Sequence, residues 1–416
     1  MPGHDRITRR RLGKAGLAGI ALLSAPLPLR HGWAQASAGL KVALLLPTTG
    51  AQAQGGQACR RGAEIANDIF ADMKMGVRLD ISHYDTGDRL ELARAQAEKA
   101  IEAGAHMLVG AFGSEQTLAI AQVAEQRGIP LVVNIAAAPQ LTEQGYKSVV
   151  RNFPTTAMLI DGALALHKEA FKASGETPKT AVLIHIDDAF GAAMASGIKA
   201  SLPKLDMPYE LLDIIPYNAG AKDLSGEVAK AKATKAELLL PVCRPADARL
   251  LVQEMVKQRW EPMGIMSPGA PGLYEPGFLK AVGKHGDFLI SNVPWLDPRL
   301  DMTKALAKRH IAKFPNDPLD LNGGFGFEGM LIAAHAWLAA KSTRPEALME
   351  ALRGIRIDRH VMIGGPIQFD AKGQNIDIKT AAVQNLKRKP TVVLPLNSAT
   401  APLTFPMPGW ADKRRT

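Results

Sequence analysis

The chain has 416 residues, of which 47% are apolar and 22% are charged, and its formal net charge is +10. This composition is typical of a folded globular chain, and the length is enough for two domains. Aromatic residues make up only 5%, and no basic stripe interleaved with aromatic residues is present, which argues against nucleic-acid binding.

Residues 1–36 are predicted to be an export signal. Three consecutive arginines, Arg9 to Arg11, precede an apolar run from Ala15 to about Leu29 and the sequence Ala-Gln-Ala at 34–36. The run is too short to span a bilayer, and the arginines resemble a twin-arginine signal. The alternatives are an ordinary secretory signal and an uncleaved anchor. The expected product starts near Ser37, lies in the periplasm, is not inserted in the membrane and carries a net charge of about +5.

Strand and helix patterns then alternate along the chain. Strands are predicted at 41–46, 77–84, 107–109, 131–133, 149–153, 180–186, 210–217, 237–242, 264–266 and 288–293, with a late strand and turn at 361–369. Helices are predicted at 56–73, 89–103, 114–127, 158–173, 192–202, 225–232, 246–259, 302–314, 325–340 and 345–354. This alternation predicts an α/β protein with parallel sheets.

Two successive α/β sets, with later elements left over, predict two doubly wound lobes between which the chain crosses three times. We expect the crossings near 153–156, 291–294 and 364–366, where the sequence is short and contains glycine or proline. The predicted division is 37–153 plus 294–364 for lobe 1, 154–293 plus 365–392 for lobe 2, and an irregular tail at 393–416.

The segment from Met107 to Gly145 carries the clearest functional signal. It contains a strand, a helix that opens at Ser114, and a second strand. Ligands of parallel sheets bind beyond the carboxyl ends of the strands, where helix N-termini present unpaired N–H groups. Ser114 is therefore predicted to hold a polar or anionic group, and the alternative is that it only caps the helix.

Several segments together resemble a known family. They are VALLLPTTG at 42–50, RRGAEIANDI at 60–69, LVGAFGSEQT at 108–117, IPLVVNIAAAPQLTEQG at 129–145, RNFPTT at 151–156, YNAGAKDLS at 217–225 and GGPIQFDAKGQ at 364–374. In order and spacing they resemble the branched-chain-amino-acid-binding (leucine-binding) receptors of ABC transporters. The resemblance implies a type I periplasmic binding fold, in which two lobes on three crossovers close on a small ligand.

The resemblance also implies first-lobe binding positions. Ser114 matches the serine that receives a ligand carboxylate, and Thr49 and Phe112 belong to the strand-end loops around it. The loop Ile135-Ala136-Ala137 matches a family loop, but Ala137 stands where a hydroxyl residue is common. Gly55 stands where an aromatic residue often lines the pocket.

In the second lobe, Phe190 replaces a tyrosine that is often found there. The segment at 267–272, where the family's acid for a ligand α-amino group is expected, contains no acid, and the nearest acids are Asp247 and Glu275. Arg244 follows a strand end and is predicted to bind a carboxylate when the lobes close, the alternative being a surface arginine. These positions predict a carboxylate ligand with an apolar or aromatic body, or an amino-acid-like ligand.

The predicted function is that of a solute receptor that delivers its ligand to the membrane permease of an ABC importer. The alternative is a sensory subunit that signals to a regulator or chemoreceptor. No catalytic motif is present, and no enzyme, cofactor or metal is predicted. The two cysteines, Cys59 and Cys243, are predicted to be free because they fall in different lobes.

Overall fold

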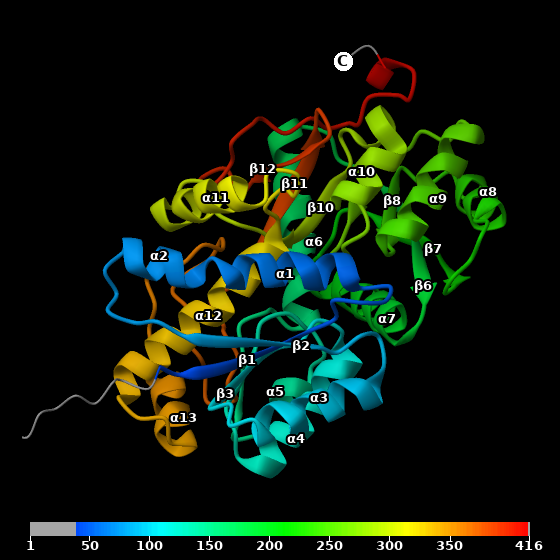
Figure 1. The fold of residues 1–416 in the computed structure, drawn as a ribbon. Helices are drawn as coiled ribbons and strands as arrows, with labels where there is room; N and C mark the ends of the chain where they lie inside the picture. Colours follow the sequence, from blue (N-terminus) through cyan, green and yellow to red (C-terminus); the bar gives the residue numbers. More distant parts are fainter. Residues whose placement is uncertain (1–38, 415–416) are drawn as a thin grey trace, which may run out of the picture. The chain divides into compact units, whose positions relative to one another are not determined.

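A computed structural model describes residues 39–414, so the predicted export signal lies outside the described residues. Two sheets organise this part of the chain, one of five strands and one of seven (Figure 1). Three passages of the chain connect them. Within residues 39–414, the helices are too short or too polar to cross a bilayer.

The five-stranded sheet is entirely parallel, with the order β2-β1-β3-β4-β5. Its strands are β1 (Lys41–Leu46), β2 (Asp80–Asp85), β3 (Met107–Gly110), β4 (Leu131–Val133) and β5 (Val149–Arg151). Alternate side chains of each strand point to opposite faces. Leu44 and Val109 accordingly join the core on one face, whereas Leu45 and Leu108 join the core on the other.

Helices cover both faces of this first lobe. On one face lie α1 (Ala53–Glu64), α2 (Ala66–Asp72), α11 (Asp301–Lys313), α12 (Leu321–Ala340) and α13 (Pro345–Gly354); on the other lie α3 (Leu90–Glu102), α4 (Ser114–Arg127) and α5 (Gln140–Glu143). Helices α1 and α12 pack with their backbones close together. A Cβ atom on Gly62 would lie 1.9 Å from the carbonyl oxygen of Gly323, so only glycine fits there.

The seven-stranded sheet forms the second lobe, with the order β12-β11-β10-β9-β8-β6-β7. Its strands are β6 (Thr180–Asp187), β7 (Glu210–Asn218), β8 (Leu238–Val242), β9 (Gly264–Ser267), β10 (Ile290–Pro294), β11 (Thr380–Leu386) and β12 (Lys389–Leu394). Strand β11 pairs antiparallel with both β10 and β12, and all other neighbouring strands of this sheet pair in parallel. The covering helices are α6 (Thr156–Ser174), α7 (Ala189–Lys204), α8 (Ser225–Ala233), α9 (Pro245–Lys257) and α10 (Pro276–Val282).

The chain crosses between the lobes three times: from β5 to α6, from β10 to α11, and from the segment after α13 to β11. The third passage lies later than the expected 364–366. Gln374 still bridges to Arg151 at the end of β5, and the chain enters the seven-stranded sheet only at Thr380. Most of the alternating elements lie where the sequence predicts them, and the fold is the predicted α/β arrangement of two parallel-dominated lobes.

Four local predictions differ from the structure. The predicted helix at 56–73 is divided at Ile65 into α1 and α2. The predicted strand at 361–369 forms only isolated bridges, such as Leu296 with Met362. The hairpin β11–β12 was not predicted. Part of the predicted irregular tail is anchored, because Met407 and Trp410 are buried against the second lobe.

Candidate functional site

The N-terminus of α4 lies directly after the carboxyl end of β3. The structure corrects one expectation here, because the N-cap is Gly113 and no side chain caps the helix. Among the described residues, no acceptor is found for the backbone amides of Ser114 and Glu115. Four N–H groups at the start of a helix lack intrahelical partners, and the helix dipole favours an anion there. The start of α4 therefore presents backbone amides without a protein acceptor.

The loop before α1 lies at the same edge of the sheet, and two carboxylates hold it. The carboxylate of Asp88 accepts hydrogen bonds from the amides of Ala51 and Gln52, just before α1 begins. Asp85 accepts from the amide of Thr49 (3.2 Å) and from its hydroxyl (2.6 Å). These carboxylates already occupy the donors of this loop, so Thr49 is committed to a contact within the protein.

Asp85 is ionised over a wide pH range. Burial raises the pKa of its carboxyl, but the hydrogen bonds from Thr49 and from the amides of Gly87 and Thr48 outweigh this effect and lower the pKa to about 2. Hydrogen bonds to a carboxylate favour its charged form. The β1–α1 loop therefore holds a fixed negative charge.

Phe112 takes the space beside Gly55. A Cβ atom on Gly55 would lie 2.4 Å from Cζ of the Phe112 ring, so a larger residue at this position would displace the ring. The absence of an aromatic side chain at Gly55 is thus matched by an aromatic ring supplied from the β3–α4 loop. Phe112 is half-buried, next to the half-buried Ser114.

The loop of Ile135, Ala136 and Ala137 is buried, and its carbonyl oxygens accept hydrogen bonds from neighbouring residues. The fully buried guanidinium of Arg151 donates to the carbonyl oxygen of Ala136 at 3.4 Å. Thr156, at the start of α6, donates to the carbonyl oxygen of Ala137 from its amide (3.0 Å) and its hydroxyl (3.1 Å). This loop is fixed by residues on both sides of the first crossover.

On the second lobe, the structure places Phe190 and Arg244 together. The guanidinium carbon of Arg244 lies 5.7 Å from the centre of the Phe190 ring, and its Nη2 lies 2.7 Å from Oδ2 of Asp188. Asp188 also caps α7 by accepting from the amide of Gly191. Arg244 is 37% exposed in its side chain. The sequence prediction did not include this ion pair, although the strand-end position of Asp188 was a signal for it.

The two acids nearest the second-lobe loop differ in their surroundings. Asp247 is buried and accepts a hydrogen bond from the hydroxyl of Tyr217 at 3.0 Å. Glu275 is also buried, and this burial, with a smaller contribution from Asp320, raises the pKa of its carboxyl to about 8. Below that pH Glu275 is mainly neutral, whereas Asp247 has one oxygen engaged by Tyr217.

The two lobes approach each other at the start of α10, just after Glu275. A Cβ atom on Gly277, at the start of α10, would lie 3.3 Å from Oε1 of Gln54 on α1. Among the described residues, no hydrogen bond or ion pair joins the first-lobe positions Thr49, Phe112 and Ser114 to Phe190 or Arg244. The structure thus brings the predicted residues together as two sets, one on each lobe.

Residues 39–414 contain no group of three or more His, Cys, Asp or Glu side chains able to hold a metal ion. Cys59 and Cys243 are both free and buried, as predicted. Burial raises the pKa of each thiol, which makes both of them unreactive.

Two α/β lobes on three crossovers, with strand-end loops on each, define a two-lobed binding protein of the type I periplasmic fold. The family model described as periplasmic binding protein matches residues 39–389. The chain therefore belongs to the periplasmic binding protein family, which is a family of solute-binding proteins and not of enzymes.

Individual relatives agree with this assignment. The leucine-, isoleucine-, valine-, threonine- and alanine-binding protein of Pseudomonas aeruginosa is 25% identical over 336 residues, covering 80% of this chain and 86% of the relative. A solute-binding protein of an ABC transporter from R. palustris, solved in complex with benzoate, has a TM-score of 0.69 at 20% identity, covering 89% of this chain and 97% of that one. A branched-chain amino acid transporter substrate-binding protein from Streptococcus pneumoniae, in complex with isoleucine, has a TM-score of 0.71 at 16% identity, covering 85% and 97%.

Proposed function

We propose that this protein is the periplasmic receptor of an ABC importer, that it binds a small carboxylate with an apolar or aromatic body, and that it delivers this ligand to a membrane permease. The observation that carries the proposal is the open N-terminus of α4, where the amides of Ser114 and Glu115 have no acceptor among the described residues. An anion is stabilised at such a helix start by the N–H groups and the helix dipole.

The remaining positions fit the rest of such a ligand. Phe112 and Phe190 supply aromatic surface for an apolar body, and Arg244 supplies unused N–H groups beside its bond to Asp188. The guanidinium has five donors, so it can hold Asp188 and a second oxygen at once. We propose that it meets the ligand when the lobes close about the three crossovers.

The nearby acids favour a ligand without a free amine. Asp188 is paired with Arg244, Asp247 accepts from Tyr217, and Glu275 has its pKa raised to about 8. An ammonium group would compete with Arg244 for Asp188 and would find Glu275 neutral, and one oxygen of Asp247 is already held by Tyr217. The benzoate-bound relative from R. palustris supports this choice, and the isoleucine-bound relative from Streptococcus pneumoniae supports the amino-acid-like alternative.

A thermal-shift screen of the purified protein tests the proposal, with amino acids, aliphatic carboxylates and aromatic carboxylates as probes. A ligand that binds only the folded protein stabilises it by about 2.7 kcal/mol at a hundredfold excess over its dissociation constant. We expect amine-free carboxylates to raise the melting temperature, and Arg244→Ala to weaken this response. Unchanged affinity of Arg244→Ala for every acidic ligand would contradict the role of Arg244, and a response only to amino acids would contradict the ligand class.

Delivery to a permease is tested separately. The ATPase activity of an ABC permease complex from the same cell, reconstituted in vesicles, should rise when the liganded protein is added outside. A permease complex that responds equally with and without the protein would exclude the proposed delivery step.

A further inference from the structure

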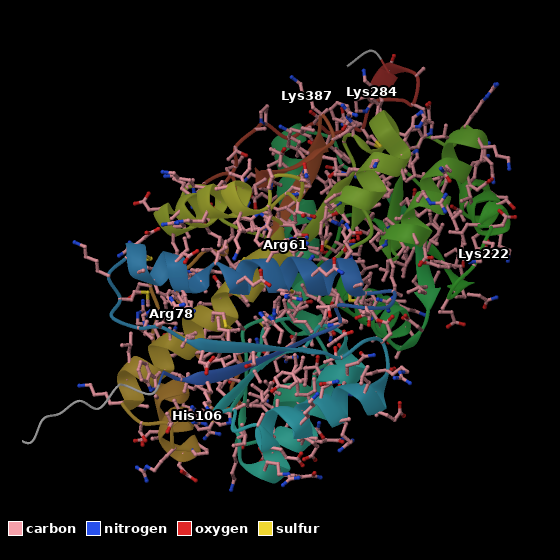
Figure 2. The ribbon with its side chains drawn as sticks, viewed as in Figure 1. Arg61, Arg78, His106, Lys222, Lys284 and Lys387 are labelled. Carbon is pink, nitrogen blue, oxygen red and sulfur yellow. The ribbon has the colours of Figure 1, made fainter. Side chains whose placement is uncertain are left out.

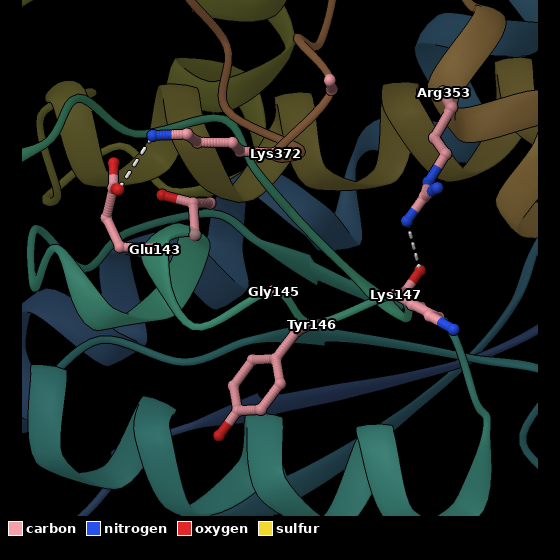
Figure 3. A pocket seen from close by; sticks show the side chains of 8 residues that line it. Glu143, Gly145, Tyr146, Lys147, Arg353 and Lys372 are labelled. Atoms are coloured by element: carbon pink, nitrogen blue, oxygen red, sulfur yellow. Dashed lines mark hydrogen bonds and ion pairs between the residues drawn. The ribbon is translucent and has the colours of Figure 1, made fainter.

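The first lobe contains a cavity of about 300 Å³ that shares no residue with the proposed ligand site. It lies among α5, the loop before β5, the end of α13 and the loop near Lys372 (Figure 3). Its walls include Thr142, Tyr146, Lys147 and Arg353. The volume is at the lower end of the range for small-molecule sites.

The walls carry more positive than negative charge. Three cationic side chains, Lys147, Arg353 and Lys372, face one carboxylate, Glu143, which lies 2.9 Å from Nζ of Lys372. Figure 3 shows Lys372 and Arg353 on either side of the loop that carries Gly145. Pairing Lys372 with Glu143 leaves two positive charges on the walls.

Two further carboxylates near the cavity accept hydrogen bonds from backbone amides, which orient them without cancelling their charge. Glu125 accepts from the amides of Lys147 and Ser148, and Asp370 accepts from those of Lys372 and Gln374. By contrast, Arg353 uses one N–H for the carbonyl oxygen of Lys147 at 3.0 Å. Its other donors, and the ammonium of Lys147, have no acceptor among the described residues.

A buried charge behind the wall adds to this excess. Arg151 is fully buried, and no carboxylate of the described residues lies within ion-pair distance of its guanidinium. It donates instead to Oγ1 of Thr142 (2.6 Å), to the carbonyl oxygen of Ala138 (2.6 Å) and to Oε1 of Gln374 (2.6 Å). Burial lowers the pKa of Arg151 to about 10, the charges of Glu143 and Asp370 oppose this shift, and Arg151 stays charged at neutral pH.

Thr142 connects the guanidinium of Arg151 to the cavity wall through a hydrogen bond. Its hydroxyl oxygen accepts from Arg151, so its hydrogen is left to donate, and no acceptor for it is found in residues 39–414. A hydroxyl that accepts from a cation becomes a stronger donor, because successive hydrogen bonds polarise one another. A buried charge without an ionic partner is costly, and a bound anion nearby reduces that cost.

We propose that this cavity is a second binding site, for a small oxyanion of the phosphate type. The hydroxyl of Thr142, the guanidinium of Arg353 and the ammonium of Lys147 bind its oxygens. The ring of Tyr146 forms the wall beside it. Lys147 and Arg353 supply positive charge for an oxyanion, and the guanidinium fork suits two oxygens of one phosphoryl group.

Isothermal titration of the purified protein with inorganic phosphate at low ionic strength tests this proposal. We expect binding of phosphate and no matching heat from chloride at the same ionic strength. The double variant Lys147→Gln/Arg353→Gln should bind phosphate at least ~10-fold more weakly, because each change removes a charge-assisted hydrogen bond. The control Lys222→Gln removes an exposed lysine of the second lobe, far from the cavity (Figure 2), and should bind as the parent does.

Three results would overturn the proposal. One is equal heat from phosphate and chloride, and another is unchanged phosphate binding by the double variant. The third is loss of phosphate binding in Ser114→Asp with retention in the double variant, which would place the anion at α4 instead. Retention of carboxylate binding by the double variant shows that it is folded and separates this site from the proposed ligand site.

Discussion

The strand-end loops of the two lobes prepare for a ligand in different ways. In the first lobe, buried groups hold the loops from behind, as Arg151 and Thr156 hold Ala136 and Ala137. In the second lobe, the exposed side chains hold each other, as Arg244 holds Asp188 above Phe190. The first lobe offers fixed backbone donors, whereas the second offers a charged side chain that can be reoriented.

This difference fits the proposed order, in which the ligand binds to the first lobe before the second lobe closes on it. Fixed donors bind an anion without paying for reorganisation, which favours initial binding to the first lobe. A partly exposed ion pair is worth little, so exchanging part of it for a ligand oxygen costs little. Contacts made only in the closed state are those that shift the equilibrium toward closure.

The largest expected effect comes from removing the buried support of the first lobe. Arg151→Met should lower the free energy of unfolding by about 4 kcal/mol, because it leaves several buried acceptors without a donor and leaves a cavity. Arg244→Met in the second lobe should cost less than about 1 kcal/mol. Calorimetric melting of both variants measures the difference. Equal melting temperatures would contradict the contrast between the lobes.

The second effect concerns Glu275, beside the contact of Gln54 with Gly277. Its carboxyl has a pKa of about 8 when folded, against an ordinary value of 4.5. The folded protein therefore holds the proton more tightly, and this contribution is complete below pH 4.5 and is lost as the pH rises to 8. The slope is at most about 1.4 kcal/mol per pH unit.

Glu275→Gln keeps the shape of the neutral carboxyl and removes its titration. The variant should melt close to the parent at pH 5 and above it at pH 8.5, as measured by calorimetry across that range. Other groups titrate equally in both proteins, so the difference between them isolates Glu275. A difference that does not change with pH would show that this carboxyl is not held neutral.

The third prediction concerns the start of α4, where one substitution should raise the stability of the protein and lower its affinity for acidic ligands. Ser114→Asp places a carboxylate in the first turn of the helix, which should stabilise the protein by about 0.5 kcal/mol through the helix dipole. The same charge should weaken acidic ligands at least tenfold, because it repels them and takes up the free amides. Calorimetric melting and titration measure the two effects. If stability and affinity both fell, α4 would not be the open anion site that we describe.

The smallest effect is that of the ion pair itself. In a double-mutant cycle with Asp188→Asn and Arg244→Gln, the coupling between the two side chains should be about 0.5 kcal/mol in the absence of ligand. Unfolding measurements on the four proteins give this value. A coupling above about 2 kcal/mol would mean that the pair is rigid and cannot exchange a contact for the ligand.

Periodicity predicted most of the fold because both lobes are built from local units of strand and helix. The bounds of β1, β4 and α13 follow directly from apolar runs and from glycine or proline at their ends. The break at Ile65 and the hairpin β11–β12 were not predictable in this way. The hairpin turns at Lys387 and Arg388, both with positive φ, and neither is a residue that marks such a turn.

The sequence predicted where the candidate binding residues lie, but not which residues they contact. The position of Ser114 follows from the strand-helix-strand pattern, yet the hydrogen bond from the amide of Gln52 to Asp88 requires residues 36 positions apart to meet. The same holds for Asp188 and Arg244, which lie 56 positions apart on neighbouring strand ends. Contacts between separate strand-end loops depend on the strand order of the sheet, which periodicity does not contain.

The most direct test of the central claim compares benzoate with benzamide, which differ in charge but hardly in shape. Titration of the purified protein with each at neutral pH measures what the carboxylate contributes at the start of α4. The account predicts that benzoate binds and that benzamide binds at least tenfold more weakly, with the gap reduced in Ser114→Asp. Equal affinity for the two probes, or preference for benzamide, would contradict it.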